Sequence, residues 1–164
     1  MTHLTVAFIV DAESKEDAIG DVRCTIEDGW CDRVGFDYAQ IYGDDLEQEG
    51  GEPQFPFLFD SEEGQRAVRE SLDWQRGEFV RYATELRTLL AETAGKSLEE
   101  VWKSFTTGRM RYTAHCIGQY SGHQIVLYDS GGCGIADLHE VEVMAGDKPL
   151  GKDKRWIVAA DVHY

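Results

Sequence analysis

A cysteine in a glycine-rich turn is the residue of this chain best placed for covalent chemistry. Cys133 lies in the segment DSGGCG, which begins at Asp129 and follows an apolar stretch expected to be a strand. A strand-to-turn position flanked by glycines exposes a nucleophile and leaves backbone N–H groups that can bind an oxyanion. His139 or His115 would act as the base, with Asp129 as its orienting group. Ile135 stands where a nucleophile elbow has its second glycine, so a tight turn around a small thiol fits the pattern as well.

The same region holds side chains from which a zinc site could be assembled. Zinc is bound by four nitrogen or sulfur ligands in a tetrahedron. The spacings here are eight, ten and six residues, which match no familiar zinc pattern. Residues 115 and 116 would also point to opposite faces of a strand. We therefore predict no metal and no cofactor, and keep a metal-binding domain as an alternative. The ligands considered are His115, Cys116, His123, Cys133 and His139.

Acidic residues are concentrated in the first part of the chain. Residues 1–60 hold 15 acidic and 3 basic side chains, a net charge of −12 out of −15 for the whole sequence. A concentrated patch creates a directional field that steers a basic partner, whereas a merely solvated acidic surface only keeps a protein soluble. Both interpretations stay open. The predicted contact residues are Asp44, Asp45, Glu47, Glu49, Glu52, Glu13, Glu16 and Asp17.

The sign of the charge limits the kind of partner. It excludes direct nucleic-acid binding through phosphate neutralisation and docking on anionic lipid. We expect a basic protein surface instead, in which carboxylates would occupy a groove meant for phosphates. A small basic loop with Lys148, Lys152, Lys154 and Arg155 either solvates a hairpin or balances the acidic half of a second copy, which leaves a homodimer open.

Hydrophobic periodicity predicts the elements that position these residues. Residues 4–10 form an apolar, β-branched run typical of a buried strand. A helix follows from a cap at Ser14 to a stop at Gly29, and alternation over 33–42 predicts a second strand. Residues 61–95 predict a long amphipathic helix, which Gly77 would bend or split. Its expected buried stripe is Val68, Leu72, Gln75, Phe79, Ala83, Leu86 and Leu90.

The remainder of the chain is predicted to be a short helix over 97–108 followed by strands. Residues 110–120 and 124–128 are expected to form a hairpin around a Ser-Gly turn, and 138–144 and 156–164 alternate as strands do. The predicted fold is α+β in two layers. A mixed, mostly antiparallel sheet of five or six strands carries two or three helices on one face, in a single domain over 1–164.

The sequence also suggests a compartment. The apolar run near the N-terminus is short and has no basic leader, which argues against a signal peptide, and no stretch approaches the roughly 20 apolar residues that span a bilayer. The four cysteines form no CxxC pair and are expected to be reduced thiols. We therefore expect a protein of the cytoplasm, or of a host cytoplasm, and no membrane partner.

Two resemblances add to these inferences. The segment 28–43, with Trp30, Tyr38 and Gly43, and the sequence DVHY over 161–164 resemble small phage-encoded proteins of unknown function. In size and charge the chain resembles the DNA-mimic inhibitors that phages and plasmids use against restriction or CRISPR systems. We therefore predict an acidic interaction module, an inhibitor that engages a nucleic-acid-binding surface of a host protein. The alternative is a small enzyme that uses Cys133.

Overall fold

The molecule is built around a mixed five-stranded sheet. A computed structural model describes residues 3–46, 55–106, 108–118 and 125–163. The strands are β1 (His3–Ala12), β2 (Tyr38–Ile41), β3 (Phe57–Leu58), β4 (Leu127–Asp129) and β5 (Lys154–His163). Their order is β2-β5-β1-β4, and β3 pairs with β5 beyond the end of β2. β5 is antiparallel to β1, β2 and β3, whereas β4 runs parallel to β1.

The two central strands are apolar on both faces because both faces are covered. Val6, Phe8 and Val10 belong to one hydrophobic cluster, whereas Ala7 and Ile9 belong to a second cluster on the opposite face of β1. A strand buried on both sides reads as a continuous apolar run rather than an alternating one. The sequence-based prediction of a buried strand at 4–10 is therefore confirmed.

One face of the sheet is covered by a short helical layer. It consists of α1 (Lys15–Thr25), the π-helical turn η1 (Ile26–Trp30) and α2 (Cys31–Val34). Ser14 caps α1, since its hydroxyl accepts a hydrogen bond from the Asp17 N–H at 3.1 Å. Gly29 interrupts the helical path with a φ of 82° and turns the chain so that the fully buried Trp30 faces the sheet.

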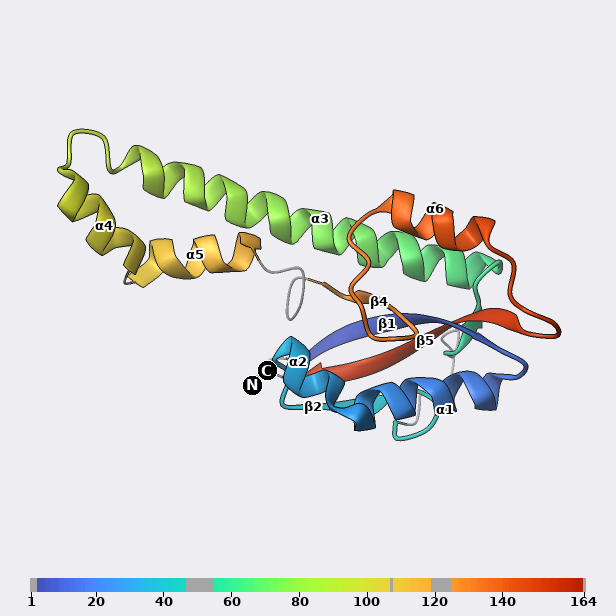
Figure 1. Cartoon of the computed structure of the whole chain (residues 1–164). Coiled ribbons are helices and arrows are strands. Elements are labelled where there is room, and N and C mark those ends of the chain that lie inside the picture. The colour runs from blue at the N-terminus through green and yellow to red at the C-terminus, as the bar shows by residue number, and fades with distance from the viewer. Residues whose placement is uncertain (1–2, 47–54, 107, 119–124, 164) are drawn as a thin grey trace.

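The other face carries α3 (Glu62–Ala91) and α6 (Leu138–Gly146), as Figure 1 shows. The expectation of helices on one face is therefore wrong, and the fold has three layers with more helices than the two or three predicted. The sheet cannot be left open on the second side because β1 and β5 are apolar there as well. Arg155 of β5 ties this layer to the sheet by donating to the Met144 carbonyl of α6. It also pairs with both carboxylate oxygens of Asp11 in β1 at 2.7 and 2.8 Å, and so is not part of a free basic loop.

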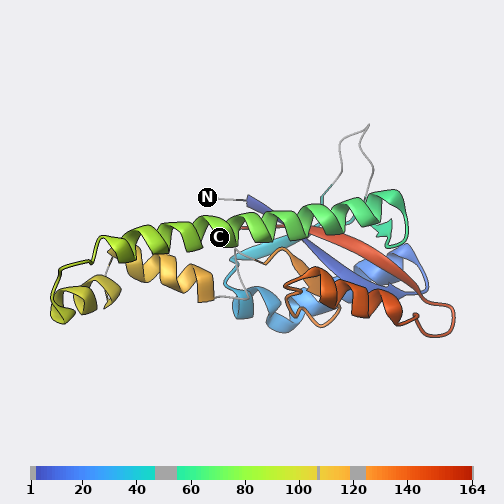
Figure 2. The same cartoon turned by 90° about the horizontal axis from the view of Figure 1, so that it is seen from above.

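Beyond the sheet, α3 continues into a helical arm. Figures 1 and 2 show the second half of α3 projecting past the strands, with α4 (Leu98–Thr106) and α5 (Gly108–Gly118) folded back beside it. Thirty residues at 1.5 Å each make α3 about 45 Å long. We define the arm as residues 77–118 and the body as the rest of the chain. No helix in the described ranges is long and apolar enough to cross a membrane.

Two segments predicted as strands are helices. Residues 108–118 form α5, whose buried Met110, Thr113 and Cys116 recur at helical spacing and face the arm interior. Residues 138–146 form α6, in which Val141 is buried and Val143 is half exposed. The predicted strand over 33–42 shortens to β2, because α2 occupies its first residues.

Candidate functional site

The acidic residues near the N-terminus gather on the outer side of the α1 layer. α1 turns Ala18 and Val22 toward the sheet, which leaves the opposite side of the helix to solvent. We call this surface the acidic face. Its members are exposed carboxylates of the α1 and η1 region: Glu13, Glu16, Asp17, Asp21, Glu27 and Asp28.

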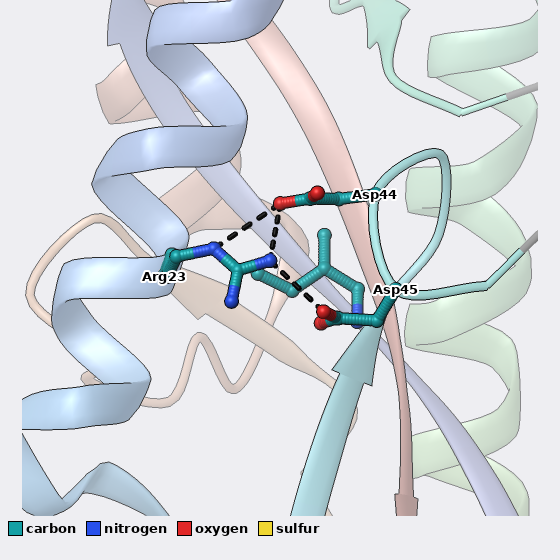
Figure 3. A network of polar contacts seen from close by, with 4 residues as sticks. Arg23, Asp44 and Asp45 are labelled. Carbon is teal, nitrogen blue, oxygen red and sulfur yellow. Dashed lines mark hydrogen bonds and ion pairs between the residues drawn. The ribbon is translucent and has the colours of Figure 1, made fainter.

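The arginine of α1 is directed toward a loop rather than toward this face. Arg23 leaves α1 sideways and binds the loop after β2, as Figure 3 shows. Its guanidinium donates to Asp44 through Nε at 3.1 Å and through Nη2, and to Asp45 through Nη2 at 3.0 Å. Asp45 also accepts the Ile41 N–H at 3.0 Å. Arg23 therefore compensates the Asp44–Asp45 pair, whereas no carboxylate of the acidic face has an ion pair within the described residues.

These contacts favour the charged forms of the side chains that make them. The Ile41 N–H and the Arg23 guanidinium, in that order, lower the pKa of Asp45, although partial burial acts in the opposite direction. The two carboxylates raise the pKa of Arg23 above its already high ordinary value. Asp45 thus acts as a turn anchor for Gly43–Leu46. The other predicted loop contacts, Glu47, Glu49 and Glu52, lie outside the described residues.

The Cys133 turn is held by the carboxylate that was expected to orient a histidine. Oδ1 of Asp129 accepts the Gly131 N–H at 2.9 Å and the Cys133 N–H at 2.8 Å. The Gly132 N–H is bound by the Asp129 carbonyl at 3.0 Å. The N–H groups of Gly131, Gly132 and Cys133 are thus already bonded, and the geometry is that of a side-chain-capped turn.

The same turn packs on the α1 layer through its glycine. Gly132 has a φ of +75°, and a Cβ added there would lie 2.4 Å from Cδ1 of Trp30. Its carbonyl accepts the Trp30 indole N–H at 3.2 Å, and the Ser130 carbonyl accepts the Thr25 hydroxyl at 2.8 Å. The glycine-rich composition is therefore explained by close packing against Trp30.

A pocket of about 470 Å³ lies where the arm leaves the body. Its rim carries the exposed side chains of Arg69, Asp73 and Arg76 from one side of α3. Neither arginine makes an ion pair within the described part of the chain. The walls are apolar and come from α3, α5, the segment before β4, and α6: Leu72, Phe79, Ile117, Ile125 and Leu138.

The floor of the pocket is fixed by a buried glutamine. Gln75 accepts the N–H groups of Val126 and Leu127 at 2.9 and 3.0 Å and donates to the Ile135 carbonyl at 2.9 Å. One side chain of α3 thus pairs three backbone groups at the start of β4 and in the segment that follows it. This pocket was not predicted from the sequence. It could have been inferred from the apolar stripe on α3, which is longer than the sheet that it was expected to cover.

Comparison with known proteins identifies one family, whose model matches residues 2–164. The chain belongs to DUF7995. The family is described as a domain of unknown function, so it assigns no activity to any residue of this DUF7995 chain. No curated protein matches the chain, and no solved structure does.

Within this DUF7995 fold the residues of the predicted cysteine site lie on three separate elements. Cys133 is exposed in the turn after β4, His139 is exposed in the first turn of α6, and His115 is exposed on α5. No hydrogen bond joins the Cys133 thiol to His139 among the described residues. The catalytic role of these residues stays a prediction, and Asp129 has a structural role in the turn.

The metal-binding alternative also gains no geometric support. Across residues 3–46, 55–106, 108–118 and 125–163, no three potential ligands among histidine, cysteine and carboxylate side chains come together. Cys116 is buried in the arm, whereas its neighbour His115 points outward from the same helix. His123 lies outside the described residues.

Proposed function

We propose that the protein is an interaction module whose acidic face engages a basic surface of another protein. The observation that carries the proposal is the common outward direction of uncompensated carboxylates on α1 and η1. Glu16, Asp21 and Glu27 are exposed and make no ion pair within the described chain, while Arg23 is engaged with the Asp44–Asp45 loop.

The physical consequence of such a face is electrostatic steering. Charges of one sign on one side raise the association rate with an oppositely charged partner by about 10- to 1,000-fold, and salt suppresses the effect because the Debye length is only about 8 Å at physiological ionic strength. A partner whose basic surface normally holds nucleic-acid phosphates satisfies this requirement. Composition supports the finer proposal of an inhibitor from a phage or mobile element.

The test is a binding measurement with a matched charge control. A partner captured by the tagged chain and identified by mass spectrometry is purified and titrated against three forms of the protein. Glu13→Gln/Glu16→Gln/Asp21→Asn removes three charges from the acidic face. Glu70→Gln/Glu92→Gln/Glu142→Gln removes three exposed charges from α3, its C-cap and α6.

The acidic-face variant should bind at least about tenfold more weakly, mostly through a slower association rate, and its affinity should depend less on salt. The control variant should bind within about twofold of the unmodified chain. Equal losses in the two variants would show that only total charge matters, and affinity that does not change with salt would also contradict the proposal.

A further inference from the structure

The apolar stripe of α3 is only half covered. Val68, Gln75 and Tyr82 are buried against the body and α5, whereas Phe79 is 51% exposed and Leu90 is 41% exposed. Phe79 also lines the pocket at the root of the arm. The pocket is therefore an apolar surface at the root of the arm, and Leu90 is a further exposed apolar side chain of the same stripe near the end of α3.

The tip of the arm presents a second apolar surface. α4 packs its inner side on α5, but Leu98 and Trp102, four residues apart on the outward side, are 88% and 65% exposed. A tryptophan and a leucine on one exposed helix face are anchor residues of the kind found at the centre of protein interfaces. The arm thus carries a pocket at its root and an exposed tryptophan, Trp102, at its tip.

Charge determines what can cover these surfaces. The arm contains six Lys or Arg and five Asp or Glu, a net charge of +1, which leaves −16 on the body of a chain whose total is −15. Two bodies repel each other, so a second copy can approach most easily at the arm. The pocket rim carries Arg69 and Arg76, and α4 carries the exposed Glu99 close to Trp102 in the same helix. None of these three charged side chains makes an ion pair among the residues that the structure describes.

We propose that two copies of this chain associate through antiparallel arms, with Trp102 of each copy seated in the pocket between α3, α5 and α6 of the other. The arrangement has twofold symmetry, because each tip meets the partner's root and the same contact occurs twice. Glu99 of one copy faces Arg76 of the other. The acidic bodies stand at opposite ends of the paired arms, several Debye lengths apart.

The experiment measures mass against concentration by light scattering after size exclusion and by sedimentation velocity. The unmodified chain should shift from the monomer mass of 18.5 kDa toward twice that value as its concentration rises. Trp102→Ala should raise the dimer dissociation constant at least about 30-fold, as truncating an interface anchor does. Leu150→Ala is the matched control, since Leu150 is 83% exposed on the loop before β5, far from the arm.

A charge exchange tests the register of the two arms. Glu99→Arg and Arg76→Glu should each weaken the dimer, and the chain that carries both substitutions should recover most of the affinity because the pair is restored in reverse. All the substituted residues are exposed, so circular dichroism should show unchanged helix content. A chain that stays monomeric at every concentration overturns the proposal and leaves the surface to a different protein. A dimer that Trp102→Ala does not weaken also overturns it.

Discussion

The body and the arm use the same kinds of residue in opposite ways. In the body, Phe8 and Val158 are fully buried between two helical layers, and the exposed charged side chains are mostly carboxylates. In the arm, aromatic and aliphatic side chains such as Phe79 and Trp102 face solvent, and the two signs of charge nearly balance. A region that completes its own core can carry a large net charge, whereas a region that leaves apolar surface uncovered is built for contact.

The largest difference between the body and the arm should be in the free energy of unfolding that is lost when one aromatic side chain is truncated in each. Phe8 is fully buried, with its ring 5.0 Å from that of Trp30 and 5.5 Å from that of Tyr128. Phe8→Ala should lower the free energy of unfolding by about 3–5 kcal/mol. Phe79→Ala should cost less than about 1 kcal/mol because half of that side chain is already exposed. Urea unfolding of the monomer, followed by circular dichroism, measures both, and similar losses would contradict the comparison.

The junction between body and arm should depend on one carboxamide. Gln75→Leu removes three hydrogen bonds and leaves the N–H groups of Val126 and Leu127 buried without a partner. We expect a loss of about 2 kcal/mol and faster hydrogen exchange at these two amides. Gln65→Leu, which removes one bond to the Phe59 carbonyl, serves as the control and should cost about half as much or less. Unchanged exchange at residues 126 and 127 would show that α3 does not hold β4.

Substitution by alanine should change the stability of the protein in opposite directions at two glycines of α3. Gly77 at the root of the arm is exposed, and a Cβ added there meets no atom within 4 Å. Gly77→Ala should therefore stabilise the protein by about 0.5–1 kcal/mol, because alanine favours the helix. Gly64 lies over β3, where a Cβ would come within 2.1 Å of the Leu58 carbonyl oxygen, so Gly64→Ala should destabilise. Thermal melting of both variants is the measurement, and a destabilised Gly77→Ala chain would indicate a bend in α3.

The smallest change in stability is expected for a substitution at the surface of the body, at Asp45, and its size should depend on pH. The pKa of Asp45 is held below its ordinary value of 3.8 by Ile41 and Arg23. A folded-state pKa below the unfolded one stabilises the protein above about pH 4, and this contribution disappears as the pH falls through the folded-state pKa. Asp45→Asn should therefore be less stable by under about 1 kcal/mol at neutral pH, given the exposure of the ion pair.

The difference between Asp45→Asn and the unmodified chain should shrink between about pH 4 and pH 2, as measured by thermal melting across this range. Asp21→Asn is the control, since Asp21 is exposed and forms no ion pair within the described residues. A difference that stays constant down to pH 2 would show that the charge of Asp45 does not matter.

Local signals in the sequence were sufficient to predict the elements that have a capping residue or a regular hydrophobic pattern. Ser14 caps its helix as predicted, and the long helix predicted from residue 61 begins with a cap at Ser61 and reaches Ala91 without a break at Gly77. The apolar run at β1 correctly indicated a buried strand. In each case the side chain's local hydrogen bond or periodicity agrees with its tertiary environment.

Two helices, α5 and α6, were wrongly predicted as strands. The prediction for α6 was misled by alternating β-branched residues, and the prediction for α5 lacked tertiary information. Val141 and Val143 alternate as in a strand, but Asp137 caps a helix here by accepting the Glu140 N–H, and Glu140 returns a bond to the Ala136 N–H. This capping box was visible in the sequence and was outweighed by the alternation. The sequence at the start of α5 contains no capping-box pattern, and Tyr112 of α5 packs on Tyr82 of α3, a contact that no local pattern reveals.

The candidate site shows the same division between local and tertiary information. Clustering of carboxylates on one face follows from the helical spacing of α1, and so could be predicted. Compensation of Asp44 and Asp45 by Arg23 depends on a loop approaching a helix more than twenty residues away, which composition cannot show. Asp129 was expected to orient a histidine. Its carboxylate instead accepts two backbone N–H groups of its own turn, a contact that was not predicted from the sequence.

The position of β5 has a consequence for how the protein is made. This strand pairs with β1, β2 and β3, yet it is synthesised after every one of them and after the arm. At about 5–20 residues per second, a ribosome needs about 2–7 s to travel from Gly118 to Lys154. Neighbouring helices pair within microseconds to milliseconds, so the nascent chain carries a formed arm beside an unfinished sheet for seconds. During that interval β1 presents an unpaired apolar edge, and translation speed through residues 119–153 sets how long it stays exposed.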